Sequence, residues 1–287
     1  MVEVTQVPEW QSLEWLCHGF STRNGGLTEA YGRPGELNLS WTPEDGDAHV
    51  RENRARLIRA AGGEGMALVT VRQVHADGVY TVDRAEDVLE GRLQTADGRA
   101  VVEADGLITD QPGILLGIQT ADCVPVIVVD PVCRRVGVFH AGWRGTVAGI
   151  AGRGVALMAA AAGAGAREQM LAAIGPSIGP CCYAVGDSVR AEFCARFAEG
   201  ASLFPQREGQ LHLDLWEANR CQLLEAGLAD DKITVLGHCT GCRRQPDAWP
   251  LYFSHRMERG KTGRIMNVAG IRAKAARRNL PGPATDL

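Results

Sequence analysis

The apolar residues of this 287-residue chain occur mainly in short runs bounded by turn residues, which is the pattern of buried strands. The clearest pair lies within residues 119–145, where the apolar run 124–130 precedes a proline-containing turn and the apolar run 136–139. Two such runs joined by a turn predict a β-hairpin. Residues 18–41 read as a strand that enters a long, glycine-rich loop. Further strands are predicted at 67–75, 78–83, 106–109, 114–120, 170–174, 211–214 and 232–242.

Helices are predicted in four segments. The first runs from about Ala48 to Ala61, is amphipathic, and is stopped by the glycine pair that follows it. The others begin near Thr146, cover about 185–198, and pass through 215–227. No helix or strand is predicted within 252–271, after which a short basic tail follows.

The order of these elements predicts the fold class. Helices and strands mix without the strict alternation of a doubly wound sheet, and several strand pairs read as hairpins. No internal repeat, low-complexity block or linker interrupts the chain. We therefore expect an α/β or α+β fold with a mixed, largely antiparallel sheet sandwich flanked by helices, in a single domain of residues 1–287.

The hairpin carries the first candidate chemistry. If Asp130 and Cys133 face each other across the turn, the same register places Cys123 opposite His140, with Cβ atoms roughly 5 Å apart. A thiolate beside an imidazole can be an activated nucleophile, and the same two groups are ligands of zinc. A small buried cysteine beside a strand-end histidine is the third interpretation. The hairpin alone leaves all three open.

Composition limits the classes of partner. The 30 basic and 34 acidic residues give a net charge of −4, which argues against a nucleic-acid or anionic-membrane partner. The chain has no apolar run of membrane-spanning length, and its first residues lack the features of a signal peptide, so we expect a cytoplasmic protein. Nine cysteines is an odd number, and in that compartment most are expected to be reduced.

Two basic segments are candidate phosphate sites. Arg23 lies beside the glycine pair of the 18–41 loop, where backbone N–H groups and a guanidinium could face one anion. Lys261 and Arg264 form the second candidate, in the sequence GKTGR. A solvated surface turn is the alternative for the first segment. The helix predicted after His140 would add a positive dipole end near the hairpin.

The remaining motifs suggest no further cofactor. The CxxC sequence at 239–242 lacks a second spaced pair, since the other neighbouring cysteines are the adjacent Cys181 and Cys182. We therefore interpret it as packing or as lining of a substrate loop. The glycine-bearing turns match neither the Walker A motif nor the dinucleotide fingerprint, so no nucleoside triphosphate or NAD site is predicted.

Seven motifs, in order, resemble those of the bacterial laccase-domain family, whose members have been called multicopper polyphenol oxidases, purine nucleoside phosphorylases and peptidoglycan editing factor. They span about residues 18–270 and read HGFSTRNGG, RQVHADGV, ADGLIT, QTADCVPV, FHAGWRG, IGPSIGPCCYAVGDSV and SHRMERGKTGR. Small departures are Ala76, where glycine is commoner, and His255, where tyrosine is usual. The family fold is related to that of a bacterial toxin cysteine deamidase.

The resemblance implies a single zinc held by His75, Cys123 and His140, which would also be the catalytic centre. Copper is the other metal to consider. The implied substrates are purine nucleosides (inosine, guanosine, adenosine and methylthioadenosine) with phosphate, and adenosine deamination is an implied second activity. The substrate-binding residues expected are Arg23, Lys261 and Arg264, chosen for their charge and loop context, together with Asn38, Asp122 and Arg144.

Three alternatives stay open beside the phosphorylase. Multicopper oxidase chemistry is disfavoured, because none of the seven histidines lies two residues from another. A cysteine hydrolase or amidase that uses Cys123 and His140 on peptidoglycan precursors is the second alternative, and a non-enzymatic partner in cell-wall assembly is the third. The sequence does not distinguish a monomer from a homodimer.

Overall fold

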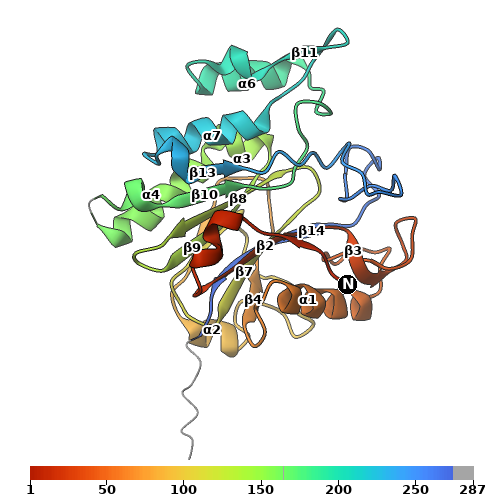
Figure 1. The fold of residues 1–287 in the computed structure, drawn as a ribbon, viewed down its shortest axis with the longest axis vertical. Coiled ribbons are helices and arrows are strands. Elements are labelled where there is room, and N and C mark those ends of the chain that lie inside the picture. The colour runs from red at the N-terminus through yellow and green to blue at the C-terminus, as the bar shows by residue number, and fades with distance from the viewer. Residues whose placement is uncertain (164, 274–287) are drawn as a thin grey trace, which may run out of the picture.

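Two β-sheets pack face to face in the computed structural model, with helices on both outer sides (Figure 1). The structure describes residues 1–163 and 165–273, so the predicted basic tail lies almost entirely outside the described residues. The five-stranded sheet has the order β1 (Val4–Thr5), β2 (Leu16–Ser21), β14 (Ile265–Ile271), β7 (Ile114–Thr120), β4 (Ala67–Thr70). The six-stranded sheet has the order β13 (Ile233–Val235), β10 (Leu171–Ile174), β8 (Val124–Asp130), β9 (Arg135–Ala141), β6 (Gly106–Thr109), β5 (Val79–Val82).

The remaining elements surround these sheets. Three further strands are β3 (Asn24–Thr28) and the two-stranded pair β11 (Gln206–Arg207) and β12 (Gln210–Leu211). The α-helices are α1 (Asp47–Ala60), α2 (Ala85–Leu89), α3 (Trp143–Ala148), α4 (Ile150–Ala162), α5 (Ala166–Gln169), α6 (Asp187–Arg196) and α7 (Leu215–Glu225). Three 3-10 helices are η1 (Pro8–Ser12), η2 (Gly200–Leu203) and η3 (Asp230–Lys232). Within the described ranges, no helix combines the length and the hydropathy needed to cross a bilayer.

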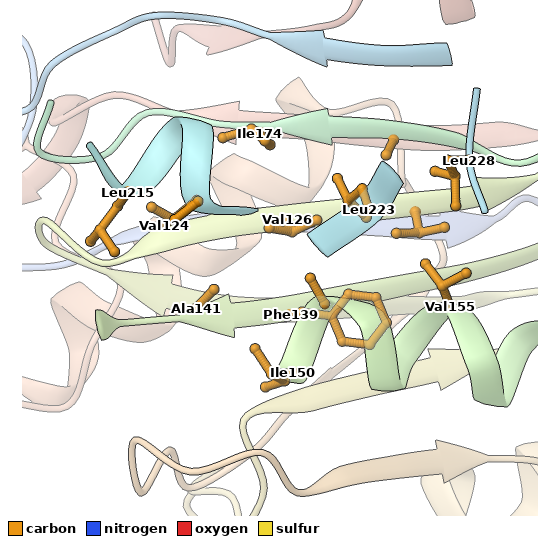
Figure 2. Close-up of a cluster of buried hydrophobic side chains, with 14 of the residues drawn as sticks. Val124, Val126, Phe139, Ala141, Ile150, Val155, Ile174, Leu215, Leu223 and Leu228 are labelled. Carbon is orange, nitrogen blue, oxygen red and sulfur yellow. The ribbon is translucent and has the colours of Figure 1, made fainter. Parts of the chain in front are cut away.

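Both faces of the six-stranded sheet are buried, which explains why β8 reads as a continuous apolar run. Its inner face, with Ile127 and Val138, packs against Leu116 and Ile118 of the other sheet. Figure 2 shows the outer face, where Val124, Val126, Phe139 and Ala141 meet Ile150 and Val155 of α4 and Leu215 and Leu223 of α7. On the other side of the molecule, α1 packs Leu57 against Leu115 and Val268 of the five-stranded sheet.

Close packing on this outer face depends on a glycine. Helix α4 passes so near β9 that a Cβ on Gly154 would lie 2.2 Å from Cζ of Phe139. Real Cβ atoms are essentially never found within 3.0 Å of another heavy atom in this way. Gly154, although unfavourable for helix propensity, therefore allows the helix to approach the sheet.

The predicted fold class is confirmed, because both sheets are mixed and most of their strand pairs are antiparallel. The predicted first helix agrees with α1 to within one residue at each end. The helix expected from Thr146 begins earlier, at Trp143, and is divided at Gly149, where φ is 88°. The 211–214 strand is reduced to the end of β12, since Asp214 instead caps α7 by accepting the Glu217 amide at 3.0 Å.

Two further predictions are wrong. The hairpin pairs Asp130 with Arg135 and Pro125 with His140, so the predicted register is shifted by two residues. The turn is longer because the Asp130 carboxylate accepts the amides of Val132 at 2.9 Å and Cys133 at 3.0 Å. The segment 252–271 contains β14, which lies between β2 and β7 and is fully buried.

Candidate functional site

Three side chains from distant parts of the chain converge at one end of the sandwich. His75 lies in the loop after β4, Cys123 directly precedes β8, and His140 is near the end of β9. Their ligand atoms all lie within 4.8 Å of one another. A two-residue register shift keeps the same sheet face, so Cys123 and His140 still share the inner face despite the longer turn.

The backbone before Cys123 is strained and firmly held. Asp122 adopts a φ of 93°, which non-glycine residues rarely do. Its carboxylate accepts hydrogen bonds from Oγ1 of Thr240 at 2.6 Å, Oγ of Ser254 at 2.7 Å and the Arg256 amide at 2.7 Å. Three donors from the long connection between β13 and β14 thus fix the peptide that presents the thiol.

The HAGWRG turn approaches the same thiol. A Cβ on Gly142 would lie 3.0 Å from Sγ of Cys123, and one on Gly145 would lie 3.0 Å from the Ala76 carbonyl oxygen. Both contacts are tighter than ordinary Cβ contacts. Glycine at these positions therefore lets α3 begin immediately beside the loop that carries His75.

Asp105 organises both histidines and was not identified from the sequence. Its buried carboxylate accepts from Nδ1 of His140 at 2.8 Å and from the amides of Val74, His75 and Ala76 at 3.2, 3.0 and 2.8 Å. The bond to Nδ1 leaves Nε2 of His140 as the nitrogen that can meet Cys123 or a metal. The ADGLIT motif contains this aspartate, but only the pairing of β6 with β9 places it beside His140.

The three groups and Asp105 form a coupled electrostatic unit. Burial opposes ionisation of Cys123, yet the charge and hydrogen bonds of His140, with a hydrogen bond from His75, lower its pKa to about 6. In return the Cys123 thiolate and Asp105 raise the pKa of His140 to about 9, against the effect of burial. Hydrogen bonds from His140 and the Ala76 amide likewise outweigh burial and hold the pKa of Asp105 below its ordinary value. The metal-free site therefore favours a thiolate–imidazolium pair at neutral pH.

The donor set fits a transition metal. Thiolate and imidazole ligands bind zinc at about 2.3 and 2.0–2.1 Å, which places neighbouring ligand atoms several ångström apart in a tetrahedron. The three ligand atoms lie within 4.8 Å of one another, which allows such an arrangement, and the Asp105–His140 bond is the carboxylate–histidine pair that orients a metal-bound imidazole. Three protein ligands leave one position open, as in catalytic rather than structural sites.

A cavity of about 770 Å³ opens over these residues, and His75, Cys123 and His140 all line it. Its lining is rich in arginine, with Asp122 as the single acidic member among the described residues. The five arginines are Arg54, Arg72, Arg99, Arg256 and Arg264. Salt bridges join Arg72 to Glu103, and Arg99 to Asp47 and Asp97.

Only two of the six predicted substrate-binding residues line the cavity. Arg264 and Asp122 line the cavity. Arg23 does not; it is buried, pairs with Glu36 at 2.5 Å and Glu258 at 3.2 Å, and lies over the ring of Phe253. This arginine is committed to protein carboxylates, because the 18–41 loop packs against the 252–258 segment instead of facing solvent.

The other three lie outside the cavity lining. Asn38 is buried behind it, where its Oδ1 accepts the backbone amide of Arg264 at 3.0 Å and so positions that residue. Arg144 is exposed and stacks on the ring of its neighbour Trp143 at 4.4 Å. Lys261 is exposed on the loop that precedes Arg264.

Comparison with known proteins identifies the relatives of this chain. The family model described as multi-copper polyphenol oxidoreductase laccase matches residues 17–272. A protein of Geobacillus stearothermophilus named purine nucleoside phosphorylase YlmD is 39% identical over 88% of this chain and 89% of its own length. A protein from an unknown prokaryotic organism named adenosine deaminase RL5 is 34% identical over 84% of this chain and 90% of its own length.

A solved structure shows the same fold. The crystal structure of Bacillus licheniformis YfiH superposes with a TM-score of 0.81 at 34% identity, over 94% of this chain and 96% of that one. The resemblance drawn from the seven motifs is thus confirmed, and the relatives are named as enzymes. The chain is an enzyme that belongs to the multi-copper polyphenol oxidoreductase laccase family.

Proposed function

We propose that this protein is a zinc-dependent purine nucleoside phosphorylase with adenosine deaminase activity. The observation that carries the proposal is the His75–Cys123–His140 group, which lies in the wall of a 770 Å³ cavity lined by arginines. Cavities of a few hundred to about 1,000 Å³ hold small-molecule ligands, so a nucleoside and a phosphate fit together in this one. The names of the two relatives point to the same substrates.

Phosphate would bind to Arg264. Among the described residues, salt bridges are found for Arg72 and Arg99 of the cavity but not for Arg54, Arg256 or Arg264. Of these three, Arg264 is the one predicted from the sequence to bind phosphate. Its Nη1 donates to the carbonyl oxygens of Thr262 and Gly263 at 3.0 and 2.9 Å, which fixes the guanidinium without neutralising it. An arginine held in this way can donate two further hydrogen bonds to a phosphate.

The nucleoside would occupy the remaining volume. Trp41, Tyr183 and His255 line the cavity and provide ring surfaces for a purine. Burial and the neighbouring Cys123 raise the pKa of Tyr183 to about 12, so its hydroxyl stays protonated at neutral pH and can donate a hydrogen bond.

Phosphorolysis transfers the ribosyl group from the purine to phosphate. A phosphate oxygen forms a bond to C1′, the bond from C1′ to N9 breaks, and the purine leaves with the electron pair and takes up a proton. In deamination, water replaces the amino group at C6 and ammonia leaves. A zinc ion bound by His75, Cys123 and His140 would supply a Lewis acid for a ring nitrogen or for water. Copper is the other metal that these donors could hold.

A cysteine hydrolase is a second candidate, favoured by one observation. Cys123, His140 and Asp105 form a nucleophile, base and orienting carboxylate of the kind found in cysteine hydrolases. His75 distinguishes the two functions, because it is a ligand in the first and lies outside the triad in the second. The His75→Ala protein should lose metal and phosphorolysis if the centre is a metal site, and retain activity if the triad acts alone.

The test of the leading proposal measures free purine release from inosine and adenosine by the purified protein. Release should require phosphate and should stop after chelation and return when zinc is added. Arg264→Ala should raise the KM for phosphate at least tenfold, because the variant loses a charge-assisted contact worth about 1.5–3 kcal/mol. Lys261→Ala is the matched control, a cation removed from the same loop but outside the cavity lining.

Purine release that persists without phosphate and without metal would reject the phosphorylase. An equal effect of the Lys261 and Arg264 substitutions on the phosphate KM would reject the assignment of Arg264.

A further inference from the structure

A second group of metal-binding side chains lies outside the cavity lining. Cys181, Cys182, Cys239 and Cys242 bring their four sulfur atoms within 4.8 Å of one another. Sγ of Cys181 and Sγ of Cys242 are 3.5 Å apart, and all four residues are free thiols. The interpretation of the CxxC sequence at 239–242 as packing or loop lining does not account for four sulfurs at one point.

The sheet order creates this group. Strands β10 and β13 are parallel neighbours, so the loops that follow them leave the same edge of the sheet. The pairing continues past both strands through a bridge between Ser177 and Cys239. The Ser177 amide donates to the His238 carbonyl at 3.1 Å, and the Thr240 amide donates to the Ser177 carbonyl at 3.0 Å. Two cysteine pairs separated by more than fifty residues of chain are thereby placed face to face.

Local geometry supports a ligand role for the CxxC turn. A Cβ on Gly241 would lie 2.9 Å from Cβ of Cys182, so only glycine allows the two loops to approach this closely. The Gly179 amide donates to Sγ of Cys239 at 3.3 Å. Despite burial, this bond and the amides within the turn lower the pKa of Cys239, as N–H groups aimed at a thiolate do.

The pKa shifts of Cys181 and Cys182 have the opposite direction. Burial and the adjacent sulfurs raise the pKa of Cys181 to about 12 and raise that of Cys182 further. Cationic residues follow the turn directly, and Nη1 of Arg244 donates to the Gly241 carbonyl at 3.2 Å. Four thiolates around a divalent ion carry a net charge of −2, which neighbouring Arg243 and Arg244 would offset.

We propose that Cys181, Cys182, Cys239 and Cys242 bind a zinc ion through four thiolates, at a site separate from the His75–Cys123–His140 group. Zn–S bonds of about 2.3 Å place the sulfurs of a tetrahedron about 3.8 Å apart, which lies between the 3.5 Å that separates Cys181 from Cys242 and the 4.8 Å within which all four sulfurs lie. A site of four cysteines has no open position, so the role of this zinc is structural.

The zinc would stabilise the two loops that contact the peptide before Cys123. Thr240 lies inside the CxxC turn, and its Oγ1 donates to the Asp122 carboxylate at 2.6 Å. Asp122 in turn precedes Cys123, and its backbone oxygen accepts the Ile178 amide at 2.9 Å. Both loops joined by the zinc thus contact the peptide that presents Cys123.

The first experiment compares zinc content by mass spectrometry of the purified full-length protein and two double variants. Wild-type protein should hold one more zinc per chain than Cys181→Ser/Cys242→Ser. The matched control is Cys133→Ser/Cys194→Ser, which removes two exposed cysteines elsewhere and should keep the wild-type zinc content. The experiment compares the zinc content of wild type and variant, so it remains valid if the His75–Cys123–His140 group holds no zinc.

The second experiment leaves the four cysteines intact and removes the other site. Cobalt-loaded His75→Ala/Cys123→Ser protein should bind one cobalt per chain and show tetrahedral d–d bands with intense thiolate charge transfer. Equal zinc in wild type and Cys181→Ser/Cys242→Ser would overturn the proposal. So would a cobalt spectrum without thiolate bands, iron in place of zinc, or two disulfides among these cysteines in the intact mass.

Discussion

Replacement of Asp105 by asparagine tests the organisation of the site most directly. The substitution keeps the shape of the side chain but changes one of its two acceptor oxygens into an NH2 donor. Oδ1 accepts from Nδ1 of His140 and the His75 amide, and Oδ2 accepts from the amides of Val74 and Ala76. Either orientation of the amide therefore sets the new donor against two existing donors, in a fully buried position.

The expected magnitude follows from these contacts. Hydrogen bonds to a charged group contribute about 1.5–3 kcal/mol each, and at least two are lost, so Asp105→Asn should lower the free energy of unfolding by about 3 kcal/mol or more. Loss of the carboxylate that orients His140 should weaken zinc binding about 10- to 100-fold, or about 1.4–2.8 kcal/mol. The pKa of Asp105 lies below its ordinary value of 3.8, so its contribution is complete at neutral pH and is lost as the pH falls through the lowered value.

Urea unfolding of the metal-free proteins and zinc titration against a competing chelator measure the two effects. Asp110→Asn is the control. Asp105 and Asp110 flank β6 on its two sides, but Asp110 is partly exposed and pairs with Arg135. Unchanged stability and zinc affinity in Asp105→Asn would refute the claim that this carboxylate holds both histidines. A stability difference from wild type that stayed constant down to pH 3 would refute its electrostatic basis.

Three further predictions concern packing and ionisation. Arg23→Ala should lower the free energy of unfolding by about 3–5 kcal/mol in a urea titration, because it leaves the carboxylates of Glu36 and Glu258 without their buried partner, while the phosphate KM stays unchanged. Gly154→Ala should lower stability by about 1–3 kcal/mol because of contact with Phe139; a rise in thermal stability would mean that helix propensity outweighs packing there. In metal-free protein, alkylation of Cys123 by iodoacetamide should increase with pH through a midpoint of about 6, and His140→Gln should move that midpoint upward; a wild-type midpoint near 8.5 would contradict the ion pair.

Local patterns predicted much of the fold and part of the site. The apolar runs at β7, β8 and β9 lie between glycine and proline turns, and such runs form buried strands wherever they pack. The hairpin placed Cys123 and His140 on one sheet face even though its register was wrong, because the error was an even number of residues. The family motifs supplied His75, whose loop has no periodic pattern of its own.

The sequence by itself thus determined the class of fold, most of the strands, and three residues of a candidate metal site. Only the tertiary structure decided the position of β14 between β2 and β7, the place of Asp105 beside His140, and the meeting of the two cysteine pairs. The tertiary structure also assigned Arg23 to a buried ion pair and Arg264 to the cavity. The physical reason is that strand formation depends on neighbouring residues, whereas strand order and loop packing depend on contacts between residues far apart in the chain.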